Sequence, residues 1–470
     1  MYSNLPITIF AFLLTLGLVV IVHELGHFLF CKLFGVYVKT FSIGIGPKFA
    51  RKRWGETEYV LSLIPFGGYV KMAGEGLMEE IQDTGTWEER KYPLGTVEGN
   101  LEAEGIDDHI PPERHFYNRP AWQRLLVFIA GPVFNLVLAF VIYTALVFAN
   151  GLQTIPFTRV GNVLADSPAA EAGLLVGDRI VVVAGQPVDD WTTIEDALLP
   201  AEVRDLAEAP PVELTVEREG LPLTLELQPL FNSENGYWSL GVEPWNTTVG
   251  LVQKGGPAAE LGLEKGDVIT TIDSQEVTSF GGIARIINDR AGQEIEIKWV
   301  RDGISMSGVV IPELKEIGVD QTGGRIFLEP FFTSRKVGFG KAISLGYQQT
   351  SGTIRVTLGV LKDFVMRKLG VDAVGGPLRI GQAAGEMLRW SFSHLMFFVA
   401  FFSVNLFLLN LMPIPVLDGG HVLFLIFEVL RGGKPVSQRL QAIATQMGLI
   451  ILLLFMTFVI VLDVWKVTGH

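Results

Sequence analysis

The sequence predicts a polytopic α-helical membrane protein with a membrane-associated β-rich segment and two α+β modules outside the membrane. Four apolar stretches approach the length of about 20 residues that a helix needs to cross a bilayer. The chain has 470 residues, of which 49% are hydrophobic, and its mean hydropathy is +0.37. A motif of 13 residues also recurs between the second and third stretches, which indicates two tandem modules.

Composition excludes some classes of function. The net charge of −13 argues against a nucleic-acid partner, which needs a basic surface. Cys31 is the single cysteine, so the chain cannot form an intrachain disulfide framework. Charged residues make up 19% of the chain, so substantial aqueous domains accompany the apolar stretches.

The four expected spans lie within residues 1–35, 121–150, 391–420 and 447–467. Basic residues set their orientation, because loops rich in Lys and Arg stay in the cytosol. No Lys or Arg precedes the first span, whereas many follow it at once, and others flank the second span or lie between the third and fourth. We therefore expect cytosolic loops at 73–120 and 421–446. Both termini and the region between the second and third spans are then expected outside.

The first span contains His23-Glu24-Leu25-Gly26-His27. On a helix this H-E-x-x-H pattern puts two imidazoles on one face, where both can bind one zinc ion. Glu24 is then placed to act as a general base on water at the zinc. Ionisable residues inside a spanning segment are costly and are candidates for function. The pattern therefore predicts metalloprotease chemistry within the bilayer.

Residues 36–72 are rich in β-branched and aromatic residues and are punctuated by glycine and proline, which is typical of strands. A strand near the zinc can hold an extended substrate by strand addition. The alternative is a small cytosolic hairpin without a role in substrate binding. The residues that we expect to bind substrate are Tyr59, Val60, Leu61, Ser62, Leu63 and Ile64.

The repeated motif begins at Pro168 and again at Pro257, and each copy contains a G-L-x-x-G-D turn. Two modules are expected, at 158–232 and 239–313, and their pattern resembles paired PDZ domains of the circularly permuted bacterial type. PDZ domains bind peptide C-termini by strand addition. The loop Ser239, Leu240, Gly241 and Val242 is the expected carboxylate-binding loop, opening the second module, which would then take peptide C-termini. The alternative role for the modules is that of rigid spacers or size gates.

Two further segments complete the expected order of elements. Residues 330–390 alternate apolar and basic positions, which predicts amphipathic helices at the outer membrane interface, in contact with lipid. Catalytic zinc usually has three protein ligands, so one more is needed. Asp418 and His421 both follow the third span, where Pro413 and Pro415 interrupt the helix. Residue chemistry alone does not choose between these two candidates.

Taken together, the H-E-L-G-H motif, a later N-x-x-P-x-P-x-x-D-G motif and the modules between them resemble the site-2 protease family, above all its bacterial members with tandem PDZ domains. The resemblance implies an intramembrane zinc metalloprotease with one Zn²⁺ per chain. It implies that Asp418 is the third ligand beside His23 and His27, and that Glu24 is the general base. It also implies that Asn410 positions the substrate or the developing oxyanion, and that His421 is structural.

The resemblance also implies substrates and a location. The expected substrates are single-span membrane proteins that have already been trimmed outside, of the anti-sigma factor type, and leftover signal peptides. The expected process is regulated intramembrane proteolysis in envelope stress signalling at the bacterial inner membrane, with periplasmic PDZ domains. One alternative is a PDZ membrane scaffold with a structural zinc, for which Glu24 would be dispensable. A metal transporter is disfavoured, because the spans contain too few carboxylates and histidines for a translocation path.

Overall fold

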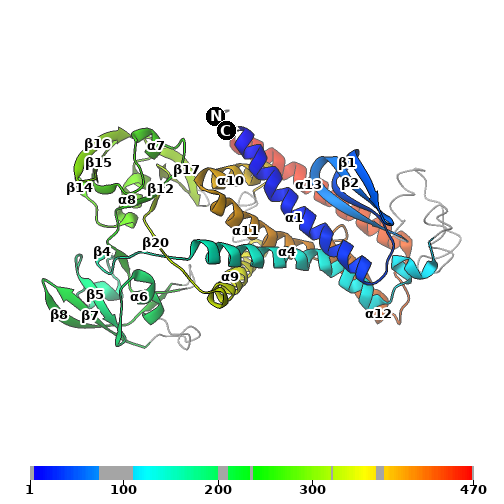
Figure 1. The fold of residues 1–470 in the computed structure, drawn as a ribbon, viewed down its shortest axis with the longest axis horizontal. Helices are drawn as coiled ribbons and strands as arrows, with labels where there is room; N and C mark the ends of the chain where they lie inside the picture. The colour runs from blue at the N-terminus through cyan, green and yellow to red at the C-terminus, as the bar shows by residue number, and fades with distance from the viewer. Residues whose placement is uncertain are drawn as a thin grey trace. The chain divides into compact units, whose positions relative to one another are not determined.

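The computed structural model describes residues 5–73, 110–198, 210–232, 237–318, 321–366 and 375–467. The chain folds into two compact units (Figure 1), one formed by Met1–Ala149 with Gly338–His470 and the other by Asn150–Val337. Most of the expected cytosolic loop 73–120 lies outside the described residues.

The first unit is helical apart from one small sheet (Figure 1). Its elements are α1 (Leu5–Leu33), β1 (Val38–Trp54), β2 (Thr57–Met72), the short 3-10 helices η2 (Pro112–Arg114) and η3 (Phe116–Asn118), α4 (Ala121–Asn150), α9 (Phe339–Val365), α10 (Pro377–Trp390), α11 (Phe392–Asn410), α12 (Asp418–Leu430) and α13 (Gln438–Val467).

Among the described residues, four helices are long and apolar enough to cross a membrane, which confirms the expected number of spans. They are α1, α4, α11 and residues Arg439–Val461 of α13. One expectation needs correction. The third span ends at Asn410, and a separate helix, α12, begins at Asp418 and occupies part of the region expected to be a loop. Pro413 and Pro415 separate the two helices, because proline cannot continue the backbone hydrogen bonds of a helix.

Two small clusters of buried side chains hold the helices of the first unit together. Ala11 on α1, Ala384 on α10 and Leu395 on α11 are fully buried against one another. Tyr143 on α4 packs with Val404 on α11 and with α9, where its hydroxyl lies 3.2 Å from the Thr353 hydroxyl. The small alanine side chains allow the close helix contacts that are common between membrane helices.

The strands β1 and β2 lie alongside α1 and share an aromatic core with it. Both strands bend, so that their halves form four adjacent segments in the order 48–54, 57–61, 40–43 and 68–72. Residues 58–61 therefore lie in the middle of this sheet, and residues 68–72 form one of its margins. Within the described residues, no further strand pairs with this margin.

The second unit contains the two repeated modules (Figure 1). The elements of the first module and its flanks are β3 (Leu152–Thr154), β4 (Val160–Val163), α5 (Pro168–Glu171), β5 (Arg179–Val183), β6 (Gln186–Pro187), α6 (Trp191–Leu198), β7 (Val212–Arg218), β8 (Leu221–Leu227), β9 (Leu230–Asn232), β10 (Tyr237–Ser239) and β11 (Val242–Pro244). Those of the second are β12 (Val249–Val252), α7 (Pro257–Leu261), β13 (Val268–Ile272), β14 (Gln275–Glu276), α8 (Phe280–Asp289), β15 (Ile295–Arg301), β16 (Ile304–Val310), β17 (Glu313–Gly318), β18 (Gln321–Arg325), β19 (Leu328–Pro330) and β20 (Thr333–Arg335).

Each module contains an antiparallel four-stranded sheet with the same strand order, β6-β5-β7-β8 in the first and β14-β13-β15-β16 in the second. The aspartate of the G-D turn is buried in both, and it stabilises the turn. Asp178 accepts hydrogen bonds from Arg218 and from the Leu175 N–H. Asp267 makes the equivalent bonds to Arg301 and to the Glu264 N–H. The repeated motif is therefore a structural element of each module.

The modules also end later than the sequence indicates. The core of the first module includes Leu240, and β11 pairs with β4, so this module continues to Pro244. The core of the second includes Ile326, and β19 pairs with β12, so it continues to Pro330. In both cases the last strand returns to the first strand of its own module. Residues 328–330 and 333–335 are accordingly strands, and the expected amphipathic helices begin at Phe339.

Candidate metal centre

The two histidines of the H-E-x-x-H motif lie on the buried stripe of α1. A helix turns every 3.6 residues, so residues three or four apart share one face. His23 and His27 are 9% and 8% exposed. The buried positions of this helix are Ala11, Thr15, Val19, His23, Gly26, His27 and Cys31.

Asp418 reaches the same place from the opposite end of the chain, as the first residue of α12. A carboxylate in the first turn of a helix is favoured by the helix dipole and the unpaired N–H groups there. Gly419 and Gly420 pack against the preceding loop, where an added Cβ would lie 2.3 Å from the carbonyl oxygens of Met412 and Ile414 respectively. The D-G-G sequence thus lets α12 begin directly against the loop that follows the third span.

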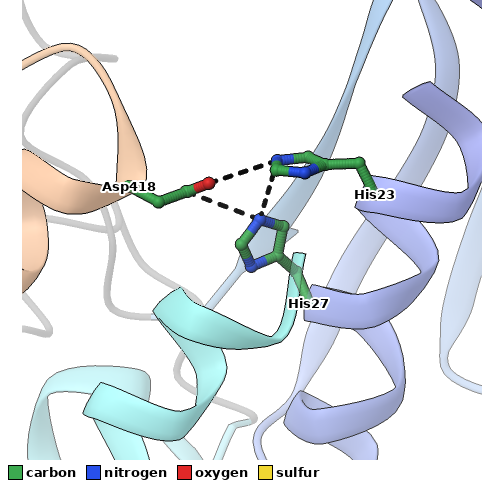
Figure 2. A group of neighbouring side chains, drawn as sticks. All are labelled: His23, His27 and Asp418. Carbon is green, nitrogen blue, oxygen red and sulfur yellow. Dashed lines mark hydrogen bonds and ion pairs between the residues drawn. The ribbon is translucent and has the colours of Figure 1, made fainter. Parts of the chain in front are cut away.

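The three side chains point at one another (Figure 2), with all their ligand atoms within 4.8 Å. The two histidine Nε2 atoms are 3.2 Å apart. Asp418 Oδ2 lies 3.2 Å from Nε2 of His23, and Asp418 Oδ1 lies 3.5 Å from Nε2 of His27. Tetrahedral zinc with bonds of about 2.0–2.2 Å separates its ligand atoms by about 3.3–3.6 Å. The donor set and its spacing therefore fit one zinc ion.

A second contact orients His27. Its Nδ1 lies 2.8 Å from the carbonyl oxygen of Val127 on α4. A donated Nδ1–H leaves the lone pair of Nε2 facing the cluster, which is the usual arrangement of a zinc-binding histidine. Gly131 makes this approach of α4 possible, because a Cβ there would lie 2.2 Å from Nε2 of His27.

Glu24 lies between the two histidines in sequence and is half-buried. It contacts the margin of the small sheet, since a Cβ added to Gly68 would lie 2.8 Å from Cγ of Glu24. Any larger residue at position 68 would displace the carboxylate. The margin formed by residues 68–72 therefore begins directly beside the candidate general base.

Two amides face His23 from the side opposite to the cluster. Nδ2 of Asn410, at the end of α11, lies 3.5 Å from His23 Nδ1. Nδ2 of Asn135 lies 3.3 Å from the same atom. Asn135 was not among the predicted site residues, although a polar residue inside a spanning segment is a signal that could have indicated it.

His421 lies apart from the three-residue cluster. Its ring stacks on Phe128 of α4, with centroids 5.0 Å apart and an angle of 9° between the planes. The structure therefore brings Asp418, and not His421, to the two histidines.

The expected substrate-binding strand needs correction. Tyr59, Val60 and Leu61 each pair with β1 on both sides, for example Val60 with Ser42 and with Arg51. Their backbone groups are already used, so these residues cannot add a substrate strand. Ser62 and Ile64 also pair with β1, at Lys48 and Ile45, and Leu63 lies between them. The margin at 68–72 offers the pairing positions instead.

The expected carboxylate-binding loop also needs correction, because it closes the first module rather than opening the second. The Ala169 N–H donates to the Leu240 carbonyl, and the Leu164 N–H donates to the Gly241 carbonyl. The second module has matching bonds, from Ala258 to Ile326 and from Gln253 to Phe327.

This match identifies Arg325–Leu328 as the corresponding loop of the second module, which the sequence did not reveal. Gly241 and Phe327 both have positive φ, 77° and 59°. The second loop was missed because a phenylalanine occupies the position at which glycine is expected. The loops come last in both modules, whereas the sequence predicted a loop at the start of the second module.

Comparison with known proteins agrees with the geometry of the cluster. The family model described as peptidase family M50 matches residues 11–455. The chain belongs to peptidase family M50. This membership makes it a zinc metalloprotease of the site-2 type.

Similar proteins cover nearly the whole chain. The regulator of sigma-E protease of Escherichia coli K12 is 32% identical, covering 95% of this chain and 96% of its own length. That of Salmonella typhimurium is 31% identical, with the same two shares of 95% and 96%. A protein of Neisseria meningitidis whose name contains the words zinc metalloprotease is 30% identical over 98% of this chain and all of its own.

Among solved structures, a PDZ domain of an SdrC-like protein from Listeria monocytogenes is 22% identical, with a TM-score of 0.16. The matched region covers 18% of the present chain and 87% of the Listeria chain.

Proposed function

We propose that this M50 peptidase hydrolyses peptide bonds within the transmembrane segments of single-span membrane proteins. The supporting observation is the cluster of His23, His27 and Asp418, which lies at a helix long and apolar enough to cross the membrane. One Zn²⁺ per chain fits this cluster. The proposed substrates are of the anti-sigma factor type, trimmed outside beforehand, together with leftover signal peptides. The names of the relatives as regulators of sigma-E support a role in envelope stress signalling.

His23, His27 and Asp418 would hold the zinc ion, which would supply Lewis-acid chemistry and make a water at the site more acidic. Glu24 is the general base that takes the proton of the attacking water, and it then gives a proton to the leaving amine nitrogen. The Asn410 amide, beside His23, donates a hydrogen bond to the scissile carbonyl oxygen as negative charge develops there. Val127 and Gly131 hold His27 in the orientation that the site requires.

A transmembrane helix hides its amide groups in internal hydrogen bonds, so the substrate must unwind before cleavage. We propose that the margin 68–72 holds the unwound segment by strand pairing. Its position beside Glu24 supports this role, and it replaces the segment Tyr59–Ile64 that the sequence indicated. An extended segment paired there would have its scissile bond near the general base.

We further propose that the protein lies in the bacterial inner membrane, with both termini and the second unit on the periplasmic side. The distribution of Lys and Arg supports this orientation. The second unit contains none of the proposed catalytic residues or zinc ligands, which supports a role for its modules as a gate on substrate size. Binding of peptide C-termini at the closing loops is a second proposed role of the modules.

Co-expression with a tagged single-span substrate tests the enzymatic function. We expect the wild type to produce a shorter fragment and Glu24→Gln to produce none, while Glu24→Gln retains its zinc. A scaffold with a structural zinc would instead keep its function in this variant, so full cellular activity of Glu24→Gln would overturn the proposal.

A further inference from the structure

The two zinc-binding histidines that we propose are supported in different ways. Both turn Nε2 toward the cluster, so each must carry its proton on Nδ1 and needs an acceptor for it. For His27 this acceptor is the Val127 carbonyl oxygen, 2.8 Å away. For His23 no backbone carbonyl is within hydrogen-bond distance of Nδ1 among the described contacts. The acceptor must come from a side chain.

Two amides compete for this role, those of Asn135 and Asn410. Nδ2 of each lies near His23 Nδ1, at 3.3 and 3.5 Å respectively. Two amide N–H donors would then face the N–H donor of His23. Meanwhile Oδ1 of Asn135 is buried and has no hydrogen-bond partner. The two ends of an amide are nearly equal in shape, and a half-turn exchanges its oxygen with its nitrogen. That half-turn gives the His23 N–H its acceptor.

Asn135 is the better placed of the two amides. It is fully buried, at 0% exposure, and its own backbone carbonyl accepts a hydrogen bond of 2.8 Å from Ser403 on α11. This bond fixes the α4 backbone at Asn135. Asn410 is half-buried and is the last residue of α11. Asn410 can therefore reach the substrate, whereas the fully buried Asn135 faces His23.

We propose that Asn135 is a positioning residue, whose Oδ1 accepts the Nδ1–H of His23 and fixes the tautomer that binds zinc through Nε2. This inference rests on the proposed zinc site. Asn135 would then accept the Nδ1–H of His23, as the Val127 carbonyl oxygen accepts that of His27. Partners of this kind typically change metal affinity by about 10–100-fold when they are removed.

The test measures the zinc dissociation constant of the purified full-length protein by competition with a chromophoric chelator. Asn135→Leu removes the acceptor at similar volume, and we expect it to weaken zinc binding by about 10–100-fold. Asn135→Asp keeps an acceptor and cannot present a donor when ionised, so we expect wild-type affinity or tighter. Asn405→Leu is the matched control, because Asn405 bonds the Phe401 carbonyl of its own helix α11, and it should bind zinc as the wild type does.

Absorption of the cobalt(II)-substituted protein supplies a second measurement, since it reports the ligand geometry. We expect Asn135→Leu to alter the spectrum and Asn135→Asp to restore it, which a purely structural role would not do. Wild-type zinc affinity in Asn135→Leu, or equal losses in the Leu and Asp variants, would overturn the inference. So would a loss confined to Asn410→Leu. Retention of zinc by His23→Ala and Asp418→Ala would instead show that the zinc site itself is wrongly placed.

Discussion

Asp418 and His421 both lie in the first turn of α12, yet they have different surroundings. The first residue of the helix faces α1, and the fourth turns its ring onto Phe128 of α4. Stacking of this kind holds a neutral or charged imidazole without using its lone pairs on a metal. The choice between two chemically reasonable ligands is therefore made by where α12 begins.

This difference leads to a prediction about zinc content. Asp418→Ala removes the only carboxylate of the cluster, so the purified variant should lose most of its zinc in elemental analysis. His421→Ala removes only the stacked ring and should keep its zinc. Full zinc occupancy in Asp418→Ala, together with loss in His421→Ala, would reverse the assignment.

We expect the stability of the second unit to depend on pH through Asp178 and Asp267. Burial by itself raises the pKa of each, but the hydrogen bonds from Arg218 and Arg301 and from backbone N–H groups outweigh it, so both pKa values lie below the ordinary one. A carboxyl with a lowered pKa contributes stability above its unfolded pKa of about 3.9. That stability is lost as the pH falls through the folded pKa.

We therefore expect the modules to lose stability below about pH 4, measured as tryptophan fluorescence during unfolding of the full-length protein in detergent. Asp267→Asn should lower the stability of the second module at neutral pH, and its stability should then fall less as the pH is lowered. Asp289→Asn alters an exposed carboxylate at the end of α8 and serves as the control. An unchanged acid profile in Asp267→Asn would show that the Asp267–Arg301 pair has no part in it.

The bent strands of the small sheet explain why a pattern of strand residues does not identify a binding edge. Residues 58–61 have the most strand-like composition, but the two halves of β1 enclose them. Gly67 and Gly68 weaken the strand pattern of the segment that forms the margin. A glycine is needed at position 68 because Glu24 lies against it. The apparent weakness in the sequence thus reflects close packing at the site.

A proline scan through residues 69–71 tests the margin as a substrate-binding strand, and position 68 is left out because a larger residue there would displace Glu24. Proline removes a backbone donor, so at positions that face away from β1 it should lower turnover of a helical substrate about 10-fold or more without removing zinc. Proline at Lys52, on the opposite margin, is the control and should leave turnover unchanged. Normal turnover at every position of 69–71, with zinc retained, would exclude strand pairing at this margin.

The proposed orientation in the membrane rests on the charges at the ends of the spans, and a reporter fusion can test it. A reporter that is active only in the periplasm should work when fused near residue 200 and should fail when fused near residue 85. The physical reason is that loops rich in Lys and Arg are retained in the cytosol. The opposite pattern of activity would place the second unit in the cytosol and exclude a gate for trimmed outer domains.

The second module can be removed at a place where its two ends meet. The Phe331 N–H donates to the Thr248 carbonyl, and the Asn246 side chain donates to the Phe331 carbonyl. Residues 247–330 can therefore be replaced by two glycines without disturbing Leu240 in the core of the first module. A deletion of 239–313 would instead remove the last strand of the first module and leave β19 of the second without a partner.

If the modules act as a gate, this excised protein should still cleave a trimmed substrate and should now also cleave the untrimmed form. The comparison is between the two forms of one substrate, with wild type and excised protein measured in parallel for zinc content. Loss of both activities, with zinc and folding retained, would mean that the module delivers the substrate or supports the catalytic helices.

Local sequence patterns were enough to predict the number of spans, the pair of histidines and the repeated modules. These features depend on local periodicity, since spans need long apolar runs, two imidazoles four residues apart share a helix face, and a repeated turn needs its aspartate in each copy. His23, Glu24 and His27 were therefore placed without knowledge of any distant contact. Asp418 needed the family resemblance, because nothing local distinguishes it from His421.

Which distant groups meet at the site depends on how the elements pack together. Asn135 and Gly131 of α4, and Gly68 of the small sheet, reach the site through packing between elements, which leaves no regular spacing in the sequence. For the same reason the loop at Ser239–Val242 was assigned to the wrong module and the second loop was missed, since each loop belongs to a strand that returns across its own module. A glycine at 241 and a phenylalanine at 327 adopt the same backbone conformation, so residue type alone could not identify the second loop.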